Sequence, residues 1–155
     1  MIVAIDFGIT NTDVAVSNKS QYKFFSMPSK NANESFIDEI ISLIDIDITE
    51  ISQIVVTGGK SNELNESFKG VNLTKISETD AIGYGTKEIY KIENEPFITL
   101  SCGTGTACIH HQDGQFSYIG GIAVGGGTIS GLSKAILDSS SLEEITDLAL
   151  NGNRK

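Results

Sequence analysis

The sequence predicts an α/β domain in which helices cover the faces of a mixed central sheet. Three β-like runs fill the first 27 residues. A segment of helical spacing, residues 34–44, follows, and a new apolar run, residues 51–57, comes after it. This order of strand, crossover helix and strand is typical of a sheet with parallel neighbours. A central stretch, residues 97–137, adds a buried-type strand, a hairpin and two glycine-rich turns.

Length and composition limit the classes of protein to consider. The 155 residues fit one domain or half of a two-lobed protein, and a hydrophobic content of 39% supports a real core. A net charge of −9 argues against nucleic acid or an anionic membrane as a partner. No long apolar run and no basic leader are visible, so we expect a cytoplasmic protein whose Cys102 and Cys108 are reduced.

The first β-like run, residues 1–5, ends at Asp6, and a turn that contains Gly8, Thr10 and Asn11 follows it. A carboxylate beside a turn that carries hydroxyl and amide groups suits hydrated Mg²⁺ next to phosphate oxygens. The alternative is structural, because aspartate and asparagine also stabilise hairpins through hydrogen bonds to the nearby backbone. Runs at residues 13–17 and 21–27 then predict the second and third strands.

The next elements alternate between helix and strand. Apolar side chains at positions 36, 37, 40, 41 and 44 predict the helix over residues 34–44. The strand at residues 51–57 stops at two glycines, and Thr57-Gly58-Gly59-Lys60 is similar to a phosphate loop without the spacing of a Walker motif. We interpret it as a strand-end turn that lines a cleft. A short helix or turn over residues 61–68 and a short strand over residues 71–76 complete this part.

A polar segment, residues 77–80, precedes a helical pattern over residues 81–92. Ser77 is a candidate N-cap, and Asp80 stands three residues later, as in a capping box. Glu78 and Asp80 could therefore serve only the helix start, where acidic side chains complement the dipole. A catalytic role for Glu78 is the competing interpretation.

The central stretch opens with a strand at residues 97–100, which breaks into the small residues of segment 101–106. Asp113-Gly114 predicts a two-residue hairpin between runs 107–111 and 115–120. Segment 125–128, Gly-Gly-Gly-Thr, then opens a helical pattern, and a second short helix is expected over residues 142–150. A glycine-rich turn at a helix start offers free amides and the positive end of a dipole, which predicts a phosphate site. Tight turns alone are the alternative.

Taken in order, these motifs resemble the type II pantothenate kinases of the actin-like, sugar-kinase-like ATPase superfamily. The segments that carry the resemblance are residues 5–10 (IDFGIT), 55–59 (VVTGG), 77–81 (SETDA), 103–106 (GTGT), 120–121 (GG) and 125–131 (GGGTISG). The resemblance spans nearly the whole chain and implies a domain of ribonuclease H-like, actin-like ATPase architecture. It also implies an ATP- and Mg²⁺-dependent kinase that phosphorylates the primary hydroxyl of pantothenate, the first step of coenzyme A biosynthesis.

The resemblance assigns roles by position. Asp6 would hold Mg²⁺ through water, Gly8, Thr10 and Asn11 would face the γ-phosphate, and Glu78 would be the catalytic base. The residues that would cradle the phosphates of ATP are Gly103, Thr104, Gly105, Gly125, Gly126, Gly127 and Thr128. Those that would contact the substrate are Thr106, Tyr118 and Gly121. A small-molecule acceptor is therefore the expected partner.

Three positions depart from the family pattern: Ile9 replaces a glycine, Asp13 replaces a lysine, and Tyr118 replaces the arginine that contacts pantothenate. Tyrosine cannot supply the charge of a guanidinium, so a kinase for a different acceptor is an alternative. Family members are also much longer. We therefore expect residues 1–155 to be a single N-terminal lobe that lacks its second, C-terminal lobe, or that forms a homodimer. The remaining alternatives are a catalytically silent nucleotide- or CoA-binding lobe and a module that dimerises through the helices after Gly127.

Overall fold

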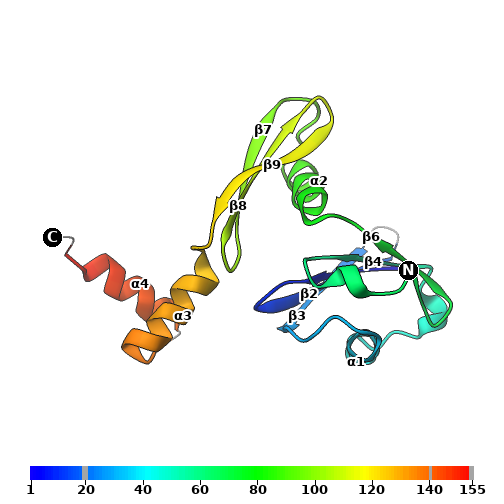
Figure 1. Ribbon diagram of the computed structural model, residues 1–155. Coiled ribbons are helices and arrows are strands. Elements are labelled where there is room, and N and C mark those ends of the chain that lie inside the picture. Colours follow the sequence, from blue (N-terminus) through cyan, green and yellow to red (C-terminus); the bar gives the residue numbers. More distant parts are fainter. Residues whose placement is uncertain (19–20, 140, 154–155) are drawn as a thin grey trace. The chain divides into compact units, whose positions relative to one another are not determined.

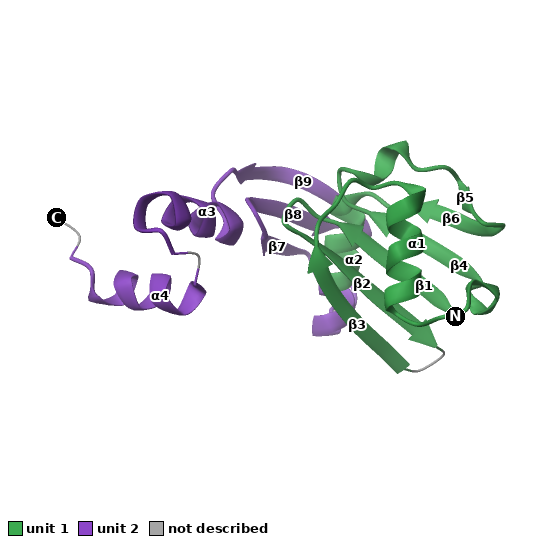
Figure 2. Cartoon of the chain, turned by 90° about the horizontal axis from the view of Figure 1, so that it is seen from below, with its two compact units in different colours: residues 1–85 green, residues 86–155 purple. Residues whose placement is uncertain are grey.

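The computed structural model describes residues 1–18, 21–139 and 141–153. The chain divides into two compact units, residues 1–85 and residues 86–155, which are drawn in different colours in Figure 2. The boundary falls within helix α2 (Glu78–Tyr90). We describe each unit by itself.

Unit 1 is built on a six-stranded mixed sheet in the order β3-β2-β1-β4-β6-β5, with all six strands labelled in Figure 2 and the chain coloured along its sequence in Figure 1. Its strands are β1 (Ile2–Phe7), β2 (Asn11–Asn18), β3 (Gln21–Pro28), β4 (Gln53–Thr57), β5 (Ser67–Phe68) and β6 (Val71–Lys75). The first three strands form an antiparallel meander, and β4 and β6 are added parallel to β1. Short 3₁₀ helices at Ile48–Glu50 and Ser61–Glu63 flank β4. The predicted crossover through a helix is therefore confirmed.

Helix α1 (Glu34–Leu43) covers one face of this sheet (Figure 2). The Asn33 side chain caps it by accepting a 2.9 Å hydrogen bond from the backbone N–H of Phe36. The helix buries its apolar stripe against alternate side chains of the strands, since neighbouring positions of a strand point to opposite faces. The buried members of this core are Val3, Ile5, Phe7, Val14, Val16, Phe36, Ile37, Ile40, Ile41, Ile44, Ile51, Ile54, Val56, Leu64, Phe68 and Leu73.

The opposite face of the sheet is open. A groove of about 580 Å³ lies there, lined mainly by small or apolar side chains such as Ala4, Ala15 and Val55. Asp6 and Asp13, with Ser26 and Thr57, are the polar members of its lining. Side chains on this face alternate with the core side chains of the same strands, so the sheet separates the core from the carboxylates.

Unit 2 begins with a three-stranded antiparallel sheet, β7 (Phe97–Cys102), β8 (Thr106–Gln112) and β9 (Gln115–Ile122). Asp113 and Gly114 form the β8–β9 turn with φ values of 51° and 76°. Two positive φ angles are the mark of a type I′ hairpin turn, which confirms the sequence prediction. His111 is buried, and its ring forms a cluster with those of Phe97 (centroids 4.7 Å apart) and Phe116 (4.9 Å), which also contact each other (6.3 Å).

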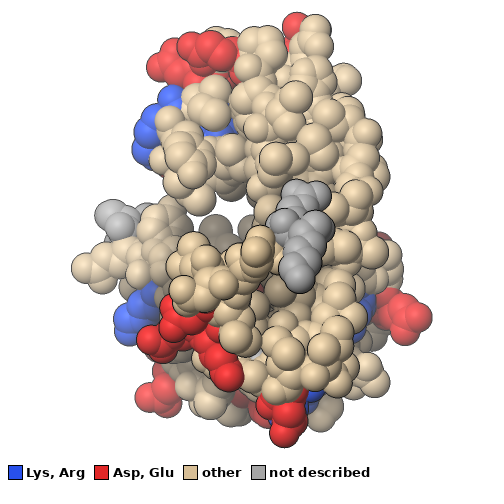
Figure 3. Space-filling view, turned by 90° about the vertical axis from the view of Figure 1, so that its left-hand side faces the viewer, with Lys and Arg blue, Asp and Glu red and all other residues tan. Residues whose placement is uncertain are grey.

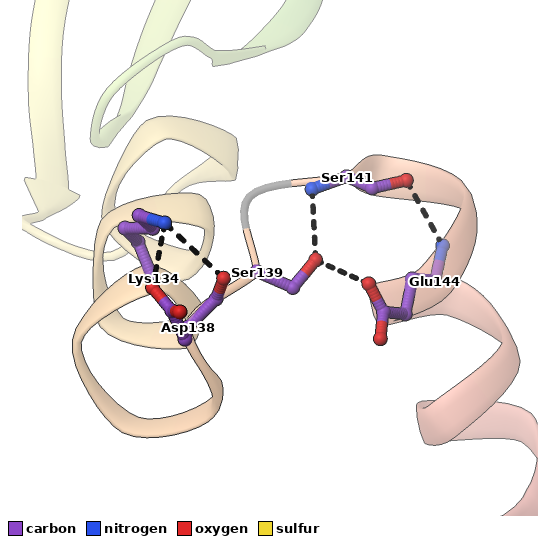
Figure 4. A network of polar contacts seen from close by, with 5 residues as sticks. All are labelled: Lys134, Asp138, Ser139, Ser141 and Glu144. Atoms are coloured by element: carbon purple, nitrogen blue, oxygen red, sulfur yellow. Dashed lines mark hydrogen bonds and ion pairs between the residues drawn. The ribbon is translucent and has the colours of Figure 1, made fainter.

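Two helices, α3 (Gly126–Leu137) and α4 (Leu142–Asn151), complete unit 2. A polar network at their junction fixes the chain reversal (Figure 4). Lys134 contacts the carboxylate of Asp138 at 2.7 Å, and Ser139 donates to Glu144. Ser141 caps α4 by accepting a hydrogen bond from the Glu144 backbone N–H. The end of one helix and the start of the next are therefore each stabilised by side chains.

The two units contain the same order of elements, which in unit 2 follows the end of α2. In unit 1 it is β1, β2, β3 and α1, and in unit 2 it is β7, β8, β9 and α3. In each, a three-residue turn joins the first two strands: residues 8–10 in unit 1 and 103–105 in unit 2. Each of these turns begins with a glycine. Five of the predicted site residues, Gly8, Thr10, Gly103, Thr104 and Gly105, therefore belong to two turns at equivalent places in a repeated arrangement.

Candidate functional site

The turn after β1 can form only because residue 8 is a glycine. A Cβ at Gly8 would lie 2.6 Å from the carbonyl oxygen of Asn11, closer than real Cβ contacts. Ser29 holds this turn from the loop after β3: its N–H donates to the Thr10 carbonyl (3.0 Å) and its hydroxyl to the Gly8 carbonyl (2.6 Å). Ile9, which replaces the family glycine, is 73% exposed. The structure thus brings together the predicted turn residues Gly8, Thr10 and Asn11.

Three carboxylates act on one another near this turn. Asp6 on β1 is the register partner of Asp13 on β2 and of Thr57 on β4. Desolvation raises the pKa of Asp6, and the negative charges of Glu78 and Asp13 raise it further. Glu78 and Asp13 are therefore close enough to Asp6 to repel its negative charge. Such a concentration of charge favours a cation.

These residues fit a hydrated magnesium ion. Among the described residues, no three His, Cys, Asp or Glu side chains converge as a ready-made metal site. Mg²⁺ commonly keeps several of its waters and takes one or two carboxylates from the protein, so a single direct or water-bridged carboxylate is sufficient. The Thr57 hydroxyl, beside Asp6, is buried and has no hydrogen-bond partner in the described structure. An orphaned polar atom next to a carboxylate is an expected neighbour for a bound water or ion.

The start of α2 separates the roles of its two acidic residues. The Ser77 hydroxyl accepts a hydrogen bond from the Asp80 N–H (3.0 Å) and donates to the Asp80 carboxylate (2.7 Å). The helix begins at Glu78, three residues earlier than predicted, with Ser77 before it. Asp80 therefore serves the cap, while the Glu78 side chain is exposed and has no hydrogen bond among the described residues. Glu78 lies in the first turn, where its charge complements the helix dipole, so both interpretations of this residue stay open.

Lys60 is a residue near the first turn to which the sequence assigned no chemical role. Its ammonium lies 3.1 Å from the Ser29 hydroxyl, which itself donates to the Gly8 carbonyl. A basic side chain is therefore present close to this glycine turn. The Thr-Gly-Gly-Lys motif was the available signal, and its separation of about fifty residues from Gly8 hid the contact.

In unit 2, the glycine turn after β7 and the start of α3 form one hydrogen-bonded element. The N–H of Gly127 donates to the Gly103 carbonyl (3.2 Å), and that of Thr128 donates to the Thr104 carbonyl (3.1 Å). A Cβ at Gly125 would lie 2.4 Å from the carbonyl oxygen of Gly105. The two glycine-rich segments are therefore packed backbone to backbone.

Threonine hydroxyls strengthen this element. The Thr128 hydroxyl lies 2.8 Å from the Thr104 carbonyl and 2.6 Å from that of Ala123, and the Thr106 hydroxyl donates to Val124 (2.8 Å). The expectation of free amides at this helix start is thus incorrect for Gly127 and Thr128, because carbonyls of the neighbouring turn accept from them. Their assignment as phosphate ligands, like that of Gly126, stays a prediction.

The three predicted substrate residues meet at one end of the sheet of unit 2. A Cβ at Gly121 would lie 2.5 Å from both the Tyr118 hydroxyl and the Thr106 carbonyl oxygen. The β8–β9 register shifts between Cys108 and Ile109, and Gly120 has a φ of 155°. Bulges of this kind re-aim side chains and are over-represented next to active sites. Tyr118 remains 59% exposed, and its hydroxyl is placed at Gly121.

Charge and hydrophobicity of the surface add two observations. On the face drawn in Figure 3, acidic side chains form several separate groups, and the described lysines lie beside some of them. Within the described residues, no helix has the length and apolar character that crossing a bilayer requires.

Known structures define the class of fold. The activator of the 2-hydroxyisocaproyl-CoA dehydratase from Clostridium difficile, with bound ADPNP, has a TM-score of 0.67 at 16% identity, covering 99% of this chain and 58% of that one. A ROK family protein from Streptococcus pneumoniae, in complex with sucrose, has a TM-score of 0.58 at 13% identity, covering 98% and 68%. The chain shares the fold of these structures, and the predicted α/β fold of the actin-like ATPase type is confirmed.

Sequence comparison finds similar proteins of one kind. A family model described as Fumble matches residues 84–155. The type II pantothenate kinase of Bacillus anthracis is 33% identical over 159 residues, covering 99% of this chain and 55% of that protein. The chain is therefore similar over nearly its whole length to type II pantothenate kinases, and it spans about half the length of the curated relatives that it matches.

Proposed function

We propose that this chain is part of an ATP- and Mg²⁺-dependent small-molecule kinase that phosphorylates the primary hydroxyl of pantothenate, the first step of coenzyme A biosynthesis. Whole-chain similarity to type II pantothenate kinases supports this proposal. The observation that carries it furthest is the Asp6, Asp13 and Glu78 group beside the Gly8–Thr10 turn, because phosphoryl transfer needs positioning and charge control.

In this proposal Asp6 holds the metal ion through water, and the turn that contains Gly8, Thr10 and Asn11 faces the γ-phosphate. Bound Mg²⁺ would neutralise charge on the phosphate oxygens. The raised pKa of Asp6 supports its assignment, since a carboxylate crowded by other carboxylates gains most from a nearby cation. In unit 2, the proposed phosphate contact is the part of the α3 start that the glycine turn leaves open, such as the Gly126 amide.

Glu78 acts as the general base in this proposal. It accepts the proton of the acceptor hydroxyl while that oxygen bonds to the γ-phosphorus and the bond from phosphorus to the β–γ bridging oxygen breaks, which releases ADP. Its exposure and its lack of a hydrogen-bond partner within the described structure leave the carboxylate available to a substrate. Asp80, which is engaged with Ser77, lacks this availability.

Tyr118 bears on which acceptor the proposed kinase phosphorylates. Its neutral hydroxyl lies at Gly121, and it can hydrogen-bond a ligand but cannot form the bidentate ion pair that arginine makes with a carboxylate. A kinase for a neutral acceptor is therefore the second candidate. A silent nucleotide- or CoA-binding lobe is the third. We also propose that a second lobe or a second copy of the chain completes the site, and that the protein is cytoplasmic.

The test is phosphate transfer from Mg·ATP, with pantothenate and its neutral alcohol panthenol as parallel acceptors. Wild-type chain, Glu78→Gln and the matched control Asp80→Asn are compared. The proposal expects transfer that Glu78→Gln lowers by about 100-fold or more, in the range of a general base, and that Asp80→Asn retains. Transfer to panthenol alone would replace pantothenate by a neutral acceptor. Equal rates in all three proteins would refute the role of Glu78, and ATP binding without transfer would favour the silent lobe.

A further inference from the structure

Lys60 lies where three loops of unit 1 meet. Its ammonium is 3.1 Å from the hydroxyl of Ser29, in the loop after β3. Ser29 in turn holds the turn after β1, through its hydroxyl to the Gly8 carbonyl and its N–H to the Thr10 carbonyl. Lys60 itself belongs to the turn after β4. A lysine from a distant part of the sequence is thereby tied to the Gly8–Thr10 turn.

The backbone that carries Lys60 is fixed. Gly58 has a φ of 88°, and a Cβ there would lie 2.5 Å from the Phe7 carbonyl oxygen, so the turn packs directly on the end of β1. Ser61 is buried, and both its N–H (3.0 Å) and its hydroxyl (2.7 Å) donate to the Gly58 carbonyl. Lys60 is itself partly buried. Its side chain therefore starts from a defined position next to the turn.

Among the residues that the structure describes, Lys60 has no ion-pair partner. Within the described residues, no carboxylate lies at ion-pair distance from its ammonium, and its recorded partner is a neutral hydroxyl. Lys30, which follows Ser29 in the chain, instead pairs with Glu39 at 2.6 Å. A partly buried ammonium that lacks an anionic partner favours the binding of an anion.

We propose that Lys60 binds the terminal phosphate of the nucleotide at the Gly8–Thr10 turn, and so supplies the positive side-chain charge of this site. The inference rests on the proposed kinase function and goes beyond it by naming the residue. The reasoning is electrostatic. The carboxylates Asp6, Asp13 and Glu78 repel a polyphosphate, so a metal ion acting alone has to offset the negative charge of both the carboxylates and the phosphates. A nearby protein cation shares this task. Three donors on a flexible stem allow the ammonium to keep its hydrogen bond to Ser29 and to donate another to a phosphate oxygen.

A purely structural Lys60 would only join Ser29 to its own turn. Glutamine can also donate a hydrogen bond to Ser29, whereas arginine restores the charge but not the shape. A structural role therefore predicts that Lys60→Gln behaves like wild type. A phosphate-binding role predicts that Lys60→Arg retains affinity and that Lys60→Gln and Lys60→Met lose it. Lys30→Met, which removes an exposed lysine paired with Glu39, is the matched control.

The experiment measures binding of Mg·ATP and of magnesium tripolyphosphate by titration calorimetry, together with the thermal midpoint of each variant. We expect Kd for both probes to rise about tenfold or more in Lys60→Met and Lys60→Gln, as for the loss of one hydrogen bond to a charged group, with Lys30→Met unchanged. Higher salt should shrink this difference. KM for ATP should rise with Kd in any transfer assay.

The outcomes separate the two proposals. Wild-type binding with unchanged affinity in Lys60→Met and Lys60→Gln would overturn the Lys60 assignment and leave the kinase proposal standing. Affinity lost in Lys60→Met but restored by Lys60→Gln would also overturn it, in favour of the structural role. No binding of either probe to the wild-type chain would overturn the nucleotide site itself and the Lys60 assignment with it.

Discussion

Replacing Gly125 by alanine should disconnect the α3 start from the glycine turn before it. Gly125 has an extended backbone, φ −152° and ψ −170°, which alanine adopts without strain, so the effect is purely steric. The new Cβ would lie 2.4 Å from the Gly105 oxygen and 2.8 Å from the Gly103 oxygen. An ordinary contact needs about 1 Å more than the shorter distance, so the turn has to move.

The magnitude follows from the hydrogen bonds that this movement stretches. They are Gly127 N–H to Gly103 (3.2 Å), Thr128 N–H to Thr104 (3.1 Å) and the Thr128 hydroxyl to Thr104 (2.8 Å). At about 1 kcal/mol each, with some replacement by water, their loss costs about 2–3 kcal/mol. This corresponds to a fall of about 30- to 150-fold in hydrogen-exchange protection of the two amides.

Gly126→Ala is the matched control. A Cβ at Gly126 meets only the Gly103 oxygen, at 3.7 Å, which is ordinary contact. Alanine in the first turn of a helix should leave protection at Gly127 and Thr128 unchanged or slightly higher. The assay is amide hydrogen exchange of both variants beside wild type. Equal protection in Gly125→Ala and Gly126→Ala would refute the backbone packing described for this element.

Two further predictions concern unit 1. Asp6→Asn should raise the thermal midpoint at pH 7 by about 2 °C, from about 0.5–1 kcal/mol after allowance for solvent screening. The folded-state pKa of Asp6 is raised, so its charged form destabilises the fold above that pKa. The increase in thermal midpoint should therefore vanish at acidic pH, where Asp6 is protonated. An increase that persists at acidic pH would contradict this electrostatic explanation. Thr57→Val should leave the thermal midpoint unchanged or raise it slightly, because it removes a buried hydroxyl that has no partner in the described structure. The same substitution should weaken Mg·ATP binding, measured by calorimetry. A clear drop in midpoint would show that the hydroxyl is satisfied.

The sequence predicted elements whose signals are local. The helical spacing of Phe36 and its neighbours and the Asp113-Gly114 turn were sufficient, since α1 and the type I′ hairpin are both observed. Helix α2 begins three residues before the predicted position, because Ser77 caps the helix directly before Glu78. Boundaries depend on such single side-chain contacts, which periodicity does not report.

The candidate site was predictable as a set of residues but not as a set of contacts. Gly8, Thr10 and Asn11 share one local turn, so their proximity followed from the sequence. The link between Lys60 and Ser29 joins residues 31 positions apart, and it depends on β4 pairing with β1. Likewise, the bonds from Gly127 and Thr128 to the turn before β8 depend on how α3 meets the sheet of unit 2.

Those bonds have a consequence for any anion that approaches α3. The carbonyl oxygens of Gly103 and Thr104 accept hydrogen bonds from two of the first three N–H groups of α3. An incoming phosphate therefore competes with these carbonyls for the same donors. It either binds the N–H groups that the carbonyls do not use, such as that of Gly126, or displaces the turn. Displacement would make loop opening part of the association step, so the on-rate would report the stability of the turn as well as encounter with the anion.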